Sequence, residues 1–192
     1  TRMLVQRSVY DQAVEIAAAK ANATKVDLPS NSGNHIGPLV SEAQFNKVQN
    51  MIQAGIDEGA RLVAGGVGRP EGMNRGWFVK PTVFADATAD MTIIREEIFG
   101  PVLALMPFDS EEEAIALAND TPYGLAAYIQ TGDKERAKRV AARLRAGMIQ
   151  VNGASRAAGS PFGGYKQSGV GREGGFWGIE EFLEIKTISG IV

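Results

Sequence analysis

The sequence contains no cysteine and a single histidine, His35. Without cysteine, these residues cannot supply a disulfide, a thiolate metal site or a thiol nucleophile. One histidine is too few for a histidine-rich metal site, and it also disfavours a serine–histidine–aspartate triad. We therefore predict no metal site within the chain.

Long hydrophobic runs and an excess of charge of one sign are also missing. No stretch approaches the roughly 18 apolar residues that a membrane-spanning helix needs, so no membrane segment is expected. The 20 lysine and arginine residues are balanced by 22 aspartate and glutamate residues, for a net charge of −2. Because nucleic-acid binding depends on clustered positive charge, we expect no nucleic-acid partner. No targeting segment is recognisable, which predicts a cytoplasmic location.

Strand-like and helix-like patterns alternate along the chain. This order predicts an α/β fold of three αβα layers around a mostly parallel sheet. Pro81 interrupts one extended segment and cannot donate to a ladder, which predicts an edge strand or a bend there. The predicted strands are residues 2–6, 61–64, 77–85, 102–108, 125–130 and 148–151.

Capping residues mark the starts of the predicted helices. Ser8 to Asp11 resembles a capping box, and the helix after it is expected to bury Ala13, Ile16 and Ala17. A second capping box spans residues 41–44. Its helix is expected to bury Phe45, Val48 and Ile52 and to stop near Gly59. Ser110 and Asp133 are expected to cap two further helices.

Residues 169–174 match G-x-G-x-x-G by spacing alone. A dinucleotide-binding fingerprint follows a strand and opens a helix, but the residues before Gly169 are typical of a loop. We therefore reject a Rossmann interpretation and expect a glycine-rich loop over residues 153–175. In that loop, Lys166 is interpreted as an anchor or a surface cation rather than a catalytic amine. Residues 183–188 alternate apolar and polar, which predicts a half-exposed strand that pairs outside this core.

Three motifs together carry a family resemblance. They are Glu-Glu-Ile-Phe-Gly-Pro-Val at 96–102, Asn-Asp-Thr-Pro-Tyr-Gly-Leu at 119–125, and Ser-Pro-Phe-Gly-Gly-Tyr-Lys-Gln-Ser-Gly at 160–169 with Gly-Arg-Glu at 171–173. In this order they resemble the C-terminal half of the NAD(P)-dependent aldehyde dehydrogenases. The resemblance implies a partial catalytic domain over residues 1–182 and an oligomerisation strand over residues 183–192, with the cofactor domain absent.

The resemblance also implies a mechanism. In the family a cysteine thiolate attacks the aldehyde, hydride passes to NAD or NADP, and water activated by a glutamate hydrolyses the thioester. The family's Thr-Arg pair closely follows that cysteine, and this chain opens with Thr1-Arg2. We therefore expect a fragment whose cysteine, general-base glutamate and oxyanion-hole asparagine lie upstream. No catalytic residue is expected in this chain, which alone would be inactive.

The resemblance assigns four candidate binding residues. Glu97 matches the glutamate that accepts hydrogen bonds from the nicotinamide-ribose hydroxyls; the alternative is a solvated surface carboxylate. Phe99 matches the aromatic residue beside that ribose, with ordinary core packing as an equal alternative. Phe162 matches an aromatic wall of the aldehyde tunnel, or is a core side chain. Arg156 could recognise an anionic tail of the substrate, although a solvated surface arginine is favoured.

Arg172, Glu173 and Glu184 match supporting positions near the family's subunit interface. The resemblance implies a homodimer or homotetramer joined through the C-terminal strand, with an aldehyde as substrate. Two alternatives remain at this stage. One is a stand-alone domain that binds or assembles without chemistry, and the other is a related acyl-phosphate or acyl-CoA reductase, which the motifs disfavour.

Overall fold

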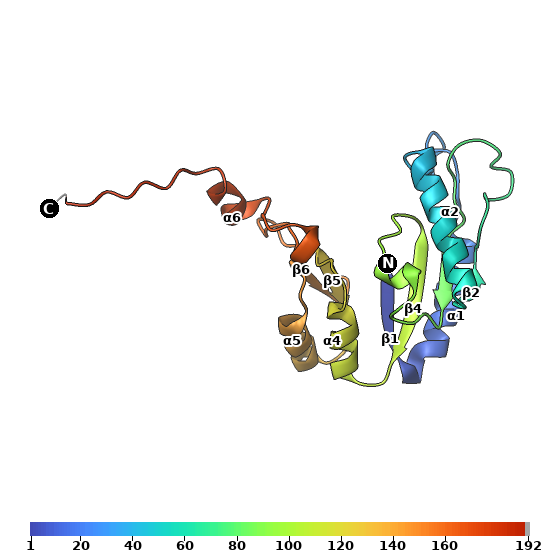
Figure 1. Cartoon of the computed structure of the whole chain (residues 1–192), viewed down its shortest axis with the longest axis horizontal. Helices are drawn as coiled ribbons and strands as arrows, with labels where there is room; N and C mark the ends of the chain where they lie inside the picture. The colour runs from blue at the N-terminus through green and yellow to red at the C-terminus, as the bar shows by residue number, and fades with distance from the viewer. Residues whose placement is uncertain (191–192) are drawn as a thin grey trace. The chain divides into compact units, whose positions relative to one another are not determined.

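The computed structural model describes residues 1–190 and divides into two units, Thr1–Ala114 and Ile115–Val192. Both units contain strands and helices (Figure 1), which confirms the α/β class. Among the described residues, no helix is long and apolar enough to cross a membrane. The predicted boundary between residues 182 and 183 stays a prediction.

A four-stranded sheet forms the centre of the first unit. It is built from β1 (Arg2–Gln6), β2 (Arg61–Ala64), β3 (Thr82–Ala85) and β4 (Val102–Phe108), in the order β1-β4-β3-β2. β4 runs parallel to both β1 and β3, whereas β2 is antiparallel to β3. The predicted mostly parallel sheet is therefore confirmed.

Helices cover both faces of this sheet. α1 (Tyr10–Ala23) packs on one face, in a core formed by Val5, Tyr10, Val14, Ala64, Val83, Ala85 and Leu105. Phe84 alternates with these β3 residues, so its fully buried ring lies on the other face. There it meets α2 (Glu42–Asp57), since a Cβ on Gly55 would come within 3.1 Å of its Cζ. The three αβα layers are thus present.

The start of α1 differs from the prediction. Residues Arg7–Val9 form a 3-10 turn, and α1 begins at Tyr10 with no side-chain cap. Ile16 is 62% exposed, whereas Tyr10 and Val14 are buried. The Tyr10 hydroxyl explains the rotation of the helix, because it donates to Leu105 O at 3.3 Å and accepts from Asp86 N at 2.6 Å. The expected burial of Ile16 was wrong.

α2 follows its predicted pattern. Ser41 Oγ accepts from Gln44 N at 3.2 Å, and the predicted residues Phe45, Val48 and Ile52 are buried. The helix ends at Asp57, and Gly59 follows in the left-handed region at φ +91°. Because a glycine adopts this φ without strain, it ends the helix as expected.

Of the strand predicted over residues 77–85, residues 82–85 form β3, and β3 is an interior strand, so the edge-strand alternative given for Pro81 was wrong. β3 pairs with β2 on one side and with β4 on the other, and all four of its residues are buried. Pro81 lies immediately before the strand, and the ladder starts with Thr82 N, which donates to Pro101 O at 2.8 Å. The missing donor of Pro81 therefore interrupts no pairing inside the sheet.

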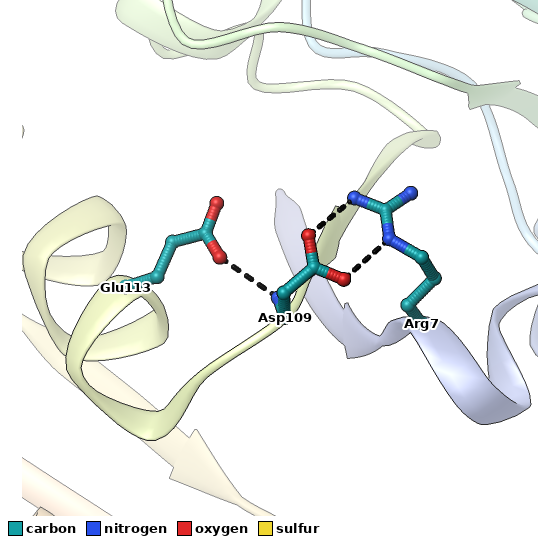
Figure 2. Close-up of polar contacts among 3 residues, drawn as sticks. All are labelled: Arg7, Asp109 and Glu113. Atoms are coloured by element: carbon teal, nitrogen blue, oxygen red, sulfur yellow. Dashed lines mark hydrogen bonds and ion pairs between the residues drawn. The ribbon is translucent and has the colours of Figure 1, made fainter.

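A bidentate ion pair joins the ends of the neighbouring strands β1 and β4 (Figure 2). Arg7 Nε and Nη2 donate to the two oxygens of Asp109 at 2.5 and 2.8 Å. Glu113 Oε2 accepts from Asp109 N at 2.8 Å. In addition, Glu113 N donates to Ser110 Oγ at 3.2 Å. Ser110 thus caps α4 (Glu111–Asn119) as predicted.

The second unit contains a two-stranded parallel sheet. β5 (Ala126–Ile129) pairs with β6 (Met148–Val151), with Ala126 opposite Met148. α5 (Lys134–Arg143) connects the two strands. Asp133 Oδ1 accepts from Glu135 N at 2.9 Å and from Arg136 N at 3.0 Å, so the predicted cap is present.

The glycine-rich segment after β6 contains more structure than a plain loop. It includes the 3-10 turn η2 (Lys166–Ser168) and is followed by α6 (Gly175–Glu180). Beyond α6, residues 183–190 form no strand within the described part of the chain, and the side chain of Ile185 is 95% exposed. The pairing predicted for this segment thus stays a prediction. Residues 191 and 192, its predicted end, lie outside the described residues.

Candidate functional site

The motif at 96–102 forms a turn between α3 (Thr92–Arg95) and β4. Glu97 and Phe99 are exposed on either side of Ile98, which is buried. Phe99 is 69% exposed and has a φ of +53°, a left-handed conformation that is uncommon for a bulky residue. Because ordinary core packing would bury the ring, the core alternative for Phe99 is wrong. The surrounding structure must hold this backbone in place.

Helix α2 supplies that support through side chains on one face. Gln44 Nε2 donates to Ile98 O at 2.8 Å and to Phe99 O at 2.9 Å. Lys47 Nζ donates to Glu97 O at 2.6 Å. The next residue, Gly100, lies so close to Val48 that an added Cβ would be 2.7 Å from Val48 Cγ2. Three consecutive carbonyls of the turn are therefore held from one helix.

The first residue of the chain lies beside the start of β4, just after this turn. Thr1 N donates to Val102 O at 3.3 Å, at the start of β4. An open cavity of about 380 Å³ lies where β1, β3 and β4 begin. It is lined by Thr1, Pro81, Pro101 and residues of α1, among others. Glu97 and Phe99 are not among its lining residues.

In the second unit, Phe162 lies on a short hairpin-like arm. Phe162 and Glu173 exchange two backbone hydrogen bonds of 2.7 Å. The Phe162 ring is 40% exposed, and the Arg156 guanidinium carbon lies 5.5 Å from its centroid. This distance is within the range of a cation–π contact. The structure thus brings together the two residues that the resemblance placed at a substrate site.

Arg172 stabilises the glycine-rich loop that contains it. Its Nη1 donates to Gly164 O at 2.8 Å and to Gly171 O at 2.9 Å, and its guanidinium carbon lies 5.4 Å from the Tyr165 ring centroid. Its backbone N donates to Glu181 Oε1 at 2.8 Å. Sequence analysis did not single out Glu181, because a glutamate at the end of a short helix carries no distinctive pattern. Glu173 and Glu184 are exposed.

Lys166 forms a second set of contacts in this unit. Its Nζ donates to Asn119 O at 2.8 Å and to Thr121 O at 3.0 Å, both in the motif at 119–125. Two of the three motifs are thus in direct contact. This arrangement favours the interpretation of Lys166 as an anchor, because the ammonium group is engaged with main-chain oxygens.

The sequence also did not reveal that Gln44 and Lys47 hold the turn at 97–99. Their spacing of three places both side chains on one face of α2, which is a detectable signal. The position of Gln44 in a capping box concealed its role. Without a structure, nothing in the sequence connects α2 with residues 97–99.

Comparison with known proteins identifies the family. Residues 1–188 match the aldehyde dehydrogenase family model. A 3-succinoylsemialdehyde-pyridine dehydrogenase of a Pseudomonas species is 50% identical over 190 residues, which is 99% of this chain and 40% of that protein. This chain therefore spans well under half the length of such relatives.

Solved structures agree. An aldehyde dehydrogenase of Bartonella henselae superposes with a TM-score of 0.94 and 56% identity, over 96% of this chain and 39% of that one. A cysteine-to-alanine variant of aldehyde dehydrogenase C of Pseudomonas syringae, in complex with NAD+ and octanal, superposes with a TM-score of 0.93 and 49% identity. The match covers 96% of this chain and 38% of that one. On this evidence, the chain belongs to the aldehyde dehydrogenase family.

Proposed function

We propose that this chain is part of an enzyme that oxidises an aldehyde to a carboxylic acid with NAD or NADP. The observation that carries the proposal is the turn at 97–99. Three of its carbonyls are held by α2, while the Glu97 carboxylate and the Phe99 ring remain exposed. The similar enzyme from Pseudomonas syringae, whose structure contains NAD+ and octanal, supports this choice of cofactor and substrate class.

Glu97 would bind the ribose next to the nicotinamide. A carboxylate has two oxygens and can accept hydrogen bonds from two neighbouring hydroxyl groups. Because Lys47 fixes its backbone carbonyl, the main chain would need little ordering when the sugar binds. Phe99 would limit the motion of the cofactor with its exposed ring. Hydride acceptance is the chemistry that a bound nicotinamide cofactor supplies.

The reacting cysteine and general base would come from other parts of the enzyme. The family pattern places that cysteine shortly before the Thr-Arg pair that opens this chain. Thr1 N donates to Val102 O at 3.3 Å, just after the turn at 97–99, which supports a position for Glu97 near that point. In this arrangement, residues 1–182 supply part of a catalytic domain and none of the groups that change covalently.

Phe162 would form an apolar wall for the body of the aldehyde. Arg156, within cation–π distance of the same ring, would then favour an aldehyde with a carboxylate at its far end, because guanidinium pairs with carboxylate in two hydrogen bonds. We assign Arg172 and Glu173 to support of this loop. Glu184 and the apolar residues around it would join a neighbouring subunit in a homodimer or homotetramer. A cytoplasmic location completes the proposal.

The test is a matched pair of substitutions in the full-length enzyme that contains this chain. Glu97→Gln should raise the KM for the nicotinamide cofactor about tenfold, the effect of removing a charge-assisted hydrogen bond. Glu96→Gln, at the exposed neighbouring carboxylate, should leave it unchanged. Equal KM values for the two variants would refute the role of Glu97. The absence of NAD- or NADP-dependent aldehyde oxidation in the parent enzyme would refute the function.

A further inference from the structure

Lys166 closes the C-terminal end of α4. Asn119 is the last residue of that helix, and its carbonyl accepts a 2.8 Å hydrogen bond from Lys166 Nζ. The last carbonyls of a helix lack partners within it and carry partial negative charge. Asn119 O also accepts from Thr121 N at 2.9 Å, so the half-buried ammonium group, which reaches Thr121 O at 3.0 Å as well, adds a second and charged donor at this helix end. The contact is therefore electrostatically favourable as well as geometrically sound.

The main chain around Lys166 is joined to the same turn. Tyr165 N donates to Gly124 O at 2.8 Å, and Gln167 N donates to Pro122 O at 3.0 Å. Gly124 N in turn donates to Ser168 Oγ at 3.0 Å. The η2 segment is thus fixed to residues 119–124 by backbone and side-chain bonds together.

The backbone of Lys166 is itself unusual. Its φ of +55° lies in the left-handed region, which glycine adopts freely and a lysine adopts at an energetic cost. Gly163, Gly164 and Gly169 are close by in the sequence, yet this position carries a long cationic side chain. The ammonium contacts described above give a physical reason for a lysine in a strained conformation.

The segment between Lys166 and Phe162 has little room to move. A Cβ on Gly147 would lie 1.9 Å from Gly163 O, so the two backbones are in direct contact. Gly164 is buried, and a Cβ there would lie 2.7 Å from Ser168 Cβ. Beyond them, Phe162 is paired with Glu173. A shift of Lys166 would therefore be passed along the chain to Phe162.

We propose that Lys166 is a positioning residue, whose ammonium clamp on the carbonyls of Asn119 and Thr121 fixes the loop that carries Phe162. Resting on the proposed function, this assigns Lys166 control over aldehyde binding. Loss of the clamp lets the apolar wall move, and the enzyme then binds the body of its substrate less well. The cofactor contacts at Glu97 lie on a separate element and are unaffected.

The decisive experiment compares three substitutions in the full-length enzyme. Lys166→Met removes the ammonium group and should raise the aldehyde KM about tenfold, as expected when an apolar pocket wall is displaced, with an unchanged cofactor KM. Lys166→Arg retains the donors and should stay near the parent value. Lys166→Gly relieves the strained φ but lacks the clamp, so it should behave like Lys166→Met. An unchanged KM in Lys166→Met, or equal values for the arginine and glycine variants, would overturn the proposal.

Two controls separate the possible causes. Lys138, an exposed lysine that pairs with Glu135 on α5, provides the matched substitution Lys138→Met, which should leave both KM values unchanged. If Lys166→Met does not fold, Lys166→Gln keeps an N–H donor without the charge and should raise the aldehyde KM about threefold. A parent-like KM in Lys166→Gln would equally count against the clamp.

A structural measurement keeps this inference distinct from the proposed function. Amide exchange at residues 162–168 should be faster in Lys166→Met than in Lys166→Arg, whether or not the enzyme oxidises aldehydes. Faster exchange in Lys166→Met together with an inactive parent enzyme would support the clamp proposal and refute the proposed function. Equal exchange rates in the two variants would refute the clamp alone.

Discussion

Gln44 Nε2 donates a 2.9 Å hydrogen bond to the carbonyl oxygen of Phe99, 55 residues further along the chain. The same nitrogen reaches Ile98 O at 2.8 Å. One amide group on α2 therefore holds two carbonyls of the turn that presents Glu97 and Phe99. Because Phe99 is held in a left-handed conformation, loss of this amide should lower the stability of the chain and change the conformation of the turn.

Gln44→Ala tests this relationship. We expect it to lower the free energy of unfolding by about 1–2 kcal/mol, the net value of two such hydrogen bonds. Gln53→Ala is the matched control on the same helix, because Gln53 is exposed and donates within its own helix to Asp57, at 2.7 Å. That substitution should change stability by about 0.5 kcal/mol or less. Urea unfolding of this chain measures both, and equal losses would contradict the role of Gln44.

Gln44 also illustrates what could be predicted from the sequence. The capping box correctly located the start of α2, because Ser41 and Gln44 are neighbours and local bonding decides the cap. The side chain of Gln44 could not be placed, since its partners Ile98 and Phe99 are distant in sequence. The family motif, in turn, identified Glu97 and Phe99 as candidates but gave no information on what holds them.

The errors have the same origin. Pro81 suggested an edge strand because its missing donor is a local property, whereas the interior position of β3 depends on pairing with β2 and β4. Ile16 was expected inside, but the bonds of Tyr10 to Leu105 and Asp86 set the rotation of α1. Short-range signals located most elements, and long-range contacts decided which of their faces are buried.

Phe84→Ala probes the core of the first unit. The Phe84 ring is fully buried between β3 and α2, so its removal leaves a cavity and should destabilise the chain by about 3–5 kcal/mol. Phe182→Ala is the control, because that ring is 89% exposed and should contribute within about 0.5 kcal/mol. Thermal or urea unfolding distinguishes them. A loss of unfolding free energy in Phe84→Ala that is smaller than the loss in Phe182→Ala would show that Phe84 is not a core residue.

Asp27 should titrate far below an ordinary aspartate. An ion pair with Lys25, then hydrogen bonds from Leu28 N and Asn31 Nδ2, lower its pKa from 3.8 to about 2. A carboxyl whose pKa is depressed by folding stabilises the native state above its unfolded pKa. This contribution should therefore decline as the pH falls from about 4 towards about 2.

NMR titration of the Asp27 carboxyl carbon provides the measurement. In Lys25→Met the midpoint should move up towards 3.8, because the largest cause of the shift is removed. Asn31→Ala should move it by less, since that hydrogen bond is a smaller contribution. A midpoint near 3.8 in the unsubstituted chain would show that the Lys25 contact does not persist in solution.

Gly147→Ala tests the close packing beneath Phe162. A Cβ at this position would stand 1.9 Å from Gly163 O and 3.0 Å from Gly164 Cα, and backbone atoms cannot yield as a flexible side chain can. The loop would have to move, which should destabilise the second unit by about 1–3 kcal/mol and loosen residues 162–168. Gly132→Ala is the control, because a Cβ there meets nothing within 4 Å. Amide exchange localises the effect: faster exchange at 162–168 in Gly147→Ala alone is expected. An equal and uniform change in both variants would mean that the contact between Gly147 and Gly163 does not constrain the loop.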